Sequence, residues 1–160
     1  MSKTLKTLGI GLYWDQLKEG DRFRTLNRTI TEPDIVNFIG VTGMVETLFT
    51  DLSFTEDHGV INGRVVPAAC TYTIIEGLLC QSTMQTTGLA LLEVEKKILK
   101  PVFAGDTVHA EVTVTGVRAT SKGNRGIVTT QNDVKNQNDE IVITYRAVRM
   151  MAGMPKDISQ

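Results

Sequence analysis

Hydrophobic and polar residues alternate along the C-terminal half of the chain. In the stretch 106–118, DTVHAEVTVTGVR, the apolar residues fall on every second position, which is the spacing of a strand with one buried face. These apolar residues are Val108, Ala110, Val112 and Val114. Residues 89–103 also have strand character, and residues 125–150 predict two more strands joined by the polar turn NQND.

Two segments in the first half carry helical signals instead. Residues 67–84 are apolar on nearly every side of a helical wheel, which predicts a buried helix. Pro67 suits its first position because the N–H that proline lacks would have no intrahelical partner there. A shorter helix is expected between Thr31 as N-cap and Gly43 as its end, whereas residues 44–63 are expected to be irregular. The pattern predicts an α+β fold, with an antiparallel β-sheet around a long central helix.

Composition narrows the class of protein without revealing its chemistry. The 160 residues predict a single domain spanning 1–160, and no apolar run reaches the roughly 18 residues that a membrane span needs. The 17 basic and 18 acidic side chains leave a net charge of −1, which argues against a nucleic-acid partner. Cys70 and Cys80 are too few for a zinc site, so we expect reduced thiols, no metal, and a cytoplasmic protein without a membrane partner.

Three stretches together resemble one family. They are YWDQLKEGDRF…TITEPDIVNFIGVTG, GRVVPAACTYTIIEGLL and LKPVFAGDTVHAEVTVTGVR…RGIVTTQNDVKNQNDEIV, of which PVFAGDTV is the most specific piece. In this order they are similar to the MaoC-like dehydratases and (R)-specific enoyl-CoA hydratases, which adopt the hotdog fold. The resemblance covers residues 13 to 150, so it implies a single MaoC-like hotdog domain with its core in that range.

The resemblance also implies an activity. Family members add water across the 2,3-double bond of an acyl-CoA thioester, or remove it, and they work as homodimers. No separate cofactor is implied, because CoA is part of the substrate. A backbone N–H at the start of the central helix polarises the thioester carbonyl, since a helix N-terminus stabilises the enolate charge that develops on that oxygen.

The sequence departs from the family pattern at the catalytic motif. The corresponding stretch is GMVETLFTD, residues 43–51, in which Met44 and Phe49 occupy the positions of the family's Asp and His. Neither side chain can transfer a proton. At the helix entry, Pro67 and Ala68 replace the family's His-Gly pair, and the backbone N–H of Ala68 remains as a donor to the carbonyl.

Several residues are candidates for the altered site. Glu46 would replace the missing acid/base, because its apolar neighbours would raise its pKa by desolvation, although a solvent-facing loop glutamate explains it equally well. Asp51 would orient a water molecule, but such a residue more often caps a turn. Pro67, Tyr72 and His58 are expected to contact substrate. Pro67 lies at the helix start, as do the hydroxyls of Tyr72 and its two neighbouring threonines. His58 lies in a loop that would border the substrate channel. A lone loop histidine is more often simply exposed.

Glu76 stands in an otherwise apolar helix, where a carboxylate needs a partner or an exit to solvent. It would serve as a thioesterase carboxylate, or its face would reach the dimer interface. The first hypothesis is a hydratase or dehydratase that uses Glu46 as acid/base and the Ala68 N–H as carbonyl donor. The alternatives are a thioesterase that uses Glu76 and a non-catalytic acyl-CoA-binding or partner subunit. The loss of both family side chains favours the last of these.

Overall fold

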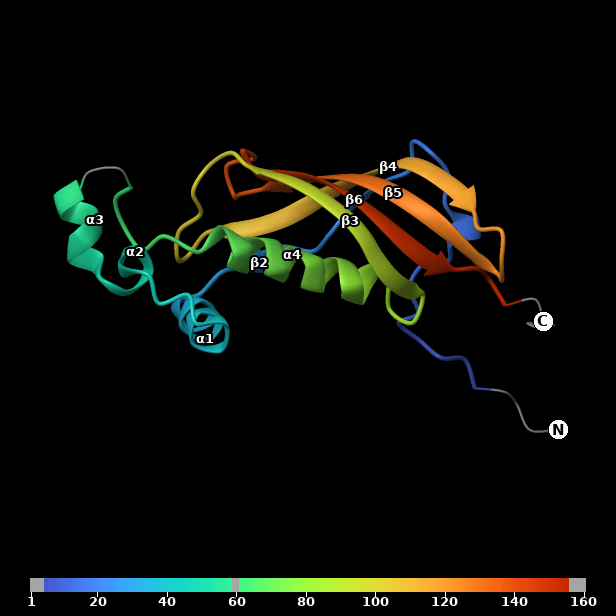
Figure 1. Cartoon of the computed structure of the whole chain (residues 1–160), viewed down its shortest axis with the longest axis horizontal. Coiled ribbons are helices and arrows are strands. Elements are labelled where there is room, and N and C mark those ends of the chain that lie inside the picture. Colours follow the sequence, from blue (N-terminus) through green and yellow to red (C-terminus); the bar gives the residue numbers. More distant parts are fainter. Residues whose placement is uncertain (1–4, 59–60, 156–160) are drawn as a thin grey trace.

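A six-stranded antiparallel sheet and one long helix dominate the molecule. The computed structural model describes residues 5–58 and 61–155. The strands are β1 (Arg22–Arg24), β2 (Arg28–Thr29), β3 (Gly88–Ile98), β4 (Thr107–Ala119), β5 (Arg125–Lys135) and β6 (Ile141–Ala152). Their order is β1-β4-β5-β6-β3, with β2 paired to β4. Figure 1 shows α4 (Ala68–Ser82) running along one face of this sheet, which confirms the predicted architecture.

The helix α4 is buried along one stripe. Its buried residues are Cys70, Thr71, Ile75 and Leu79. Ile75 is fully buried and belongs to the same core as Val142 and Tyr145 of β6. Thr73 and Cys80 are exposed on the other side, so the prediction of a helix buried all round is wrong for the single chain. The reason is geometric: one sheet covers only one side of a helix.

The helix α1 (Glu32–Thr42) begins and ends where the sequence predicted. Asp34 Oδ2 accepts hydrogen bonds from the backbone N–H of Thr31 at 2.8 Å and from its hydroxyl at 2.7 Å. The helix stops at Gly43, whose φ of 71° is a left-handed conformation that glycine adopts without strain.

Residues 44–63 contain two short helices where irregular chain was expected. They are α2 (Thr47–Thr50) and α3 (Leu52–His58), and a 3-10 turn, η1 (Trp14–Gln16), lies near the N-terminus. A single turn such as α2 is too short to show helical periodicity in the sequence. In Figure 1, α1, α2 and α3 lie beyond the N-terminal end of α4. No helix in the described part of the chain is long and apolar enough to cross a bilayer.

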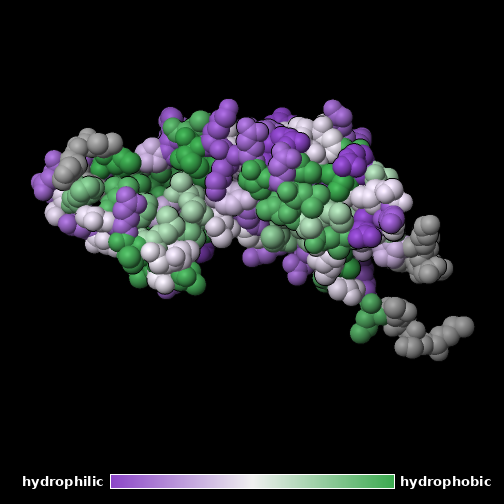
Figure 2. Space-filling model, in the orientation of Figure 1, coloured by the Kyte–Doolittle hydropathy of each residue, from purple (hydrophilic) through white to green (hydrophobic). Residues whose placement is uncertain are grey.

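The strand β3 forms an edge of the sheet. It pairs with β6 on one side, and all its residues except Val94 are exposed, including Leu89, Leu91 and Leu92. Figure 2 shows hydrophobic groups gathered over β3 and the adjoining part of α4. An unpaired, apolar edge of this length is a template for pairing with another chain.

A polar cluster joins the middle of α4 to β6. Glu76 Oε1 accepts hydrogen bonds from Arg149 Nη2 and from the Tyr145 hydroxyl, both at 2.6 Å. Arg149 Nη1 also donates to the Thr130 hydroxyl at 3.2 Å. The side chains of Arg149 and Glu76 are only 8% and 17% exposed, so this is a largely buried ion pair. It gives Glu76 the partner that a carboxylate in an apolar helix requires.

We predict that Glu76→Ala lowers the free energy of unfolding by about 3–5 kcal/mol, because it leaves the Arg149 guanidinium buried without its counter-charge. Glu93→Ala is the matched control, since Glu93 pairs with Arg146 on the surface, where the two side chains are 58% and 43% exposed. That control should cost no more than about 1 kcal/mol. Urea denaturation measures both, and equal effects of the two variants would contradict a structural role for the buried pair.

Candidate active site

An apolar pocket lies at the N-terminal end of α4. Its volume is about 350 Å³. Side chains from α2, from the segment that enters α4, from α4 itself, from the end of β3 and its connection to β4, and from β6 line it. They are Leu48, Phe49, Ile61, Val65, Val66, Ala68, Thr71, Ile98, Leu99, Lys100, Pro101, Val102 and Ile143. The size and apolar lining are typical of a site for a small organic group.

Backbone pairing fixes where α4 begins relative to this pocket. The N–H of Val66 donates to the carbonyl of Val102 at 2.8 Å, and the N–H of Ala104 donates to the carbonyl of Arg64 at 2.9 Å. The chain then turns at the buried Pro67, which is the N-cap, so the helix starts one residue later than predicted. As the first helical residue, Ala68 has no intrahelical acceptor for its N–H. The pocket therefore carries a backbone donor at the positive end of a helix.

The altered motif forms one wall of the pocket. Leu48 and the buried Phe49 line it, whereas Glu46 is exposed, precedes α2 as its N-cap and is not among the lining residues. Arg64 holds this wall in place: its guanidinium donates to the carbonyl of Phe49 and pairs with Glu32, with Nε 2.9 Å from both carboxylate oxygens. Apolar surroundings were expected for the Glu46 carboxylate. They are found instead around Leu48 and Phe49, whereas Glu46 is exposed.

The other predicted site residues lie elsewhere. Asp51 Oδ1 accepts hydrogen bonds from the backbone N–H and hydroxyl of Ser53, at 2.9 and 2.6 Å, and so caps the start of α3. The Ser53 hydroxyl and then its N–H hold the pKa of Asp51 below the ordinary value. His58 ends α3, and its side chain lies outside the described part of the chain.

Tyr72 is not among the residues that line the pocket. Its ring meets the ring of Tyr145 edge-on at 5.2 Å between centroids, and Lys96 Nζ lies 4.3 Å from its centroid. Burial, and then the charge of Glu76, raise the pKa of the Tyr72 hydroxyl. Of the five predicted site residues whose side chains the structure describes, Ala68 alone is brought into the pocket lining. Thr71 also lines the pocket, although the sequence indicated it only as one of several hydroxyls near the helix start.

Two other reactive groups are accounted for without catalysis. Glu76 is not among the residues that line the pocket, and two donors from β6 occupy its Oε1, which weighs against its use as a thioesterase carboxylate. Cys70 is buried in the first turn of α4, and burial, followed by the charge of Asp34, raises the pKa of its thiol to about 11. Its nucleophilic thiolate form is therefore scarce near neutral pH.

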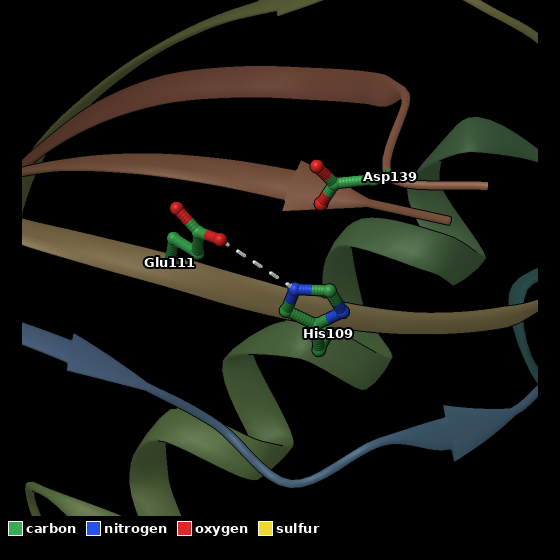
Figure 3. Close-up of side chains that lie close together, drawn as sticks. All are labelled: His109, Glu111 and Asp139. Carbon is green, nitrogen blue, oxygen red and sulfur yellow. Dashed lines mark ion pairs between the residues drawn. The ribbon is translucent and has the colours of Figure 1, made fainter. Parts of the chain in front are cut away.

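A cluster of ionisable groups lies away from the pocket, at the β4 strand and the turn between β5 and β6. It contains His109, Glu111 and Asp139, which Figure 3 shows close together. Lys135 Nζ lies 3.0 Å from Glu111 and 3.1 Å from Asp139, so an ammonium group already provides the positive charge between the carboxylates. Burial, followed by the charge of Arg24, lowers the pKa of His109. A metal ion would have to displace Lys135, and we assign no metal site here.

The comparison with known families decides what kind of site the pocket belongs to. Residues 16–137, more than half of the sequence, match the family described as "MaoC like domain". The chain belongs to this family. In this MaoC-like domain, the matched residues include α2, the segment that enters α4, α4 itself and the β3–β4 connection, all of which contribute to the pocket lining.

Individual proteins agree with this assignment. A segment of 51 residues is 45% identical to mesaconyl-CoA hydratase of Cereibacter sphaeroides, but it covers 32% of this chain and 15% of that enzyme. The crystal structure of a MaoC-like dehydratase from Rhodospirillum rubrum matches with a TM-score of 0.76 and 27% identity, over 91% of this chain and 99% of that one. A double-hotdog protein from Mycobacterium tuberculosis matches with a TM-score of 0.83 and 18% identity, over 91% of this chain and 46% of its own. The MaoC-like domain therefore has the hotdog fold.

Proposed function

We propose that this MaoC-like domain binds the acyl group of a CoA thioester in the pocket at the start of α4 and polarises its carbonyl there. In this proposal it is the acyl-CoA-binding partner subunit of a hydratase or dehydratase. The observation that carries the proposal is the lining itself: apolar side chains surround one helix N-terminus whose first N–H has no intrahelical acceptor.

The pocket suits the acyl part of such a ligand. Its volume of about 350 Å³ is far too small for the CoA portion, but it accommodates a short hydrocarbon chain. An apolar wall favours the chain by removing it from water. The helix dipole and the free N–H stabilise negative charge on the thioester oxygen. Similarity to a segment of mesaconyl-CoA hydratase and to a MaoC-like dehydratase supports a thioester ligand over other small organic molecules.

The lining also indicates that the acid and base for water addition come from outside this pocket. Among the described residues that line it, only Lys100 has a side chain that ionises, and its ammonium group pairs with Glu140 at 2.5 Å. Water addition needs a positioned acid and base, and a phenylalanine ring cannot act as either. Phe49, at the position of the family's histidine, instead extends the apolar wall.

A second candidate is hydration by the chain itself with Glu46 as acid/base. One observation favours it: Glu46 immediately precedes the helix turn that carries Leu48 and Phe49, so its carboxylate lies close in sequence to the pocket wall. Its position counts against it, because Glu46 is exposed and is not among the residues that line the pocket.

We also propose that the domain works as a homodimer joined through β3. The exposed apolar edge supports this, since pairing with a second copy would satisfy the free backbone groups of the strand. The double-hotdog neighbour carries two such units in one chain, and this domain matches 46% of it, which supports a need for a second unit.

Ala68→Pro should weaken the binding of acyl-CoA. Proline removes the N–H, but it is tolerated at the first helical position, and the φ of −51° and ψ of 127° at Pro67 are already those required before a proline. We expect butyryl-CoA to bind at least tenfold more weakly to the variant than to the parent in calorimetric titration. Ala68→Gly, which keeps the N–H, is the control. Undiminished binding by Ala68→Pro would rule out the backbone donor.

Incubation with crotonyl-CoA separates the two candidate functions. We expect binding without loss of the conjugated double bond above the background rate, because the described lining of the pocket holds no acid/base pair. Hydration by the parent that falls roughly 100-fold in Glu46→Gln would instead establish the second candidate. Glu56→Gln is the control, since Glu56 is an exposed glutamate on the neighbouring helix α3.

Light scattering at micromolar concentration should give the mass of a dimer. Leu91→Lys, which places a charge on the exposed edge strand, should raise the dimer dissociation constant about tenfold or more. Leu26→Lys is the control, because Leu26 is 84% exposed and lies in the short connection between β1 and β2. A monomer mass for the parent protein would refute the homodimer.

A further inference from the structure

Thr71 has a buried hydroxyl that forms no hydrogen bond with the described residues. It lies in the first turn of α4 and is fully buried. Its Oγ1 has no hydrogen-bond partner within the described part of the molecule. A buried hydroxyl without a partner destabilises the free protein, so a ligand atom that completes the hydrogen bond is bound more tightly.

Other hydroxyls on the same helix behave differently. Those of Thr73 and Ser82 donate to the carbonyl four residues earlier, at 2.7 and 2.8 Å. A serine or threonine hydroxyl in a helix commonly forms this local hydrogen bond. For Thr71 the corresponding carbonyl is that of Pro67, and it receives the backbone N–H of Thr71 at 3.3 Å rather than the hydroxyl. Thr71 is thus the exception within α4, and it is also a threonine that lines the pocket.

The position of Thr71 relative to Ala68 indicates which part of a ligand it meets. Ala68 is half-buried, whereas Thr71 is fully buried, and both line the pocket. Thr71 lies three residues further along the helix, which is about 4.5 Å along its axis. With CoA outside and the thioester carbonyl at the Ala68 N–H, the acyl chain passes inward and reaches the floor of the pocket near Thr71.

Given the proposed function, we infer that Thr71 determines specificity for acyl groups that carry an oxygen atom beyond the thioester carbonyl, as 3-hydroxyacyl thioesters do. A threonine hydroxyl both donates and accepts, so it pairs with a hydroxyl or a carbonyl oxygen. Threonine in a helix adopts two χ1 rotamers, and rotation between them points the hydroxyl in a different direction. A plain hydrocarbon chain leaves the hydroxyl unpaired and is bound roughly tenfold less tightly.

The test compares 3-hydroxybutyryl-CoA with butyryl-CoA by calorimetric titration of the parent protein, Thr71→Val, Thr71→Ser and Thr73→Val. The parent should prefer the hydroxylated ligand about tenfold. Thr71→Val should lose that preference while it keeps its affinity for butyryl-CoA, because valine matches the shape of threonine without the hydroxyl. Thr71→Ser and Thr73→Val should retain the preference.

The outcomes separate this inference from the proposed function. If the parent binds neither thioester, the proposed function fails and the inference fails with it. If the parent binds both thioesters but Thr71→Val discriminates between them as well as the parent does, the proposed function survives and the role of Thr71 is refuted. Thermal denaturation without ligand adds an independent readout: Thr71→Val should melt at or above the parent temperature. A clearly lower midpoint would mean that the hydroxyl already has a partner and would overturn the inference.

Discussion

The buried ion pair between Glu76 and Arg149 is the interaction on which the arrangement of the molecule depends. A hydrophobic stripe alone holds a helix against a sheet without fixing its rotation strictly, because apolar contacts are not directional. The hydrogen bonds from Arg149 and Tyr145 to one carboxylate oxygen of Glu76 are directional. They set the face of α4 that meets the sheet. That choice in turn places Ala68 and Thr71, two turns and one turn before Glu76, at the pocket.

In the pocket, side chains supply most of the apolar surface, and the backbone supplies a polar group. The side chains around it are almost all hydrocarbon, whereas the polar features come from the helix start and from the Thr71 hydroxyl. Backbone donors are held by the fold and need no reorganisation when a ligand arrives. In the function proposed above, these backbone and hydroxyl groups bind and polarise the carbonyl, and that role does not depend on the side chains at Met44 and Phe49.

The sequence predicted those elements whose signals are local. The alternation in β4, and the residues Thr31 and Gly43 at the ends of α1, act over a few positions and were predicted correctly. The helices α2 and α3 were missed, because one is a single turn and the Asp51 cap of the other looked like a turn residue or a site residue. Glu76 was recognised as anomalous, but its partner lies 73 residues away, and no local pattern links the two. In the site, Ala68 was predicted through resemblance to the family. The sequence did not show which of Thr71 and Tyr72 lines the pocket, because the rotation of α4 depends on the distant contact of Glu76 with Arg149.

The order of the strands also bears on how the chain is made. The strand β3 follows α4 directly in the sequence, yet its partner in the sheet is β6, which is the last strand. During synthesis, α4 and β3 leave the ribosome well before β6 exists. The pairing edge of β3 and the carboxylate of Glu76 therefore remain without their partners until translation has passed residue 149. While the chain between β3 and β6 is being made, the incomplete domain exposes an unpaired strand, and such exposure favours association with other incomplete chains.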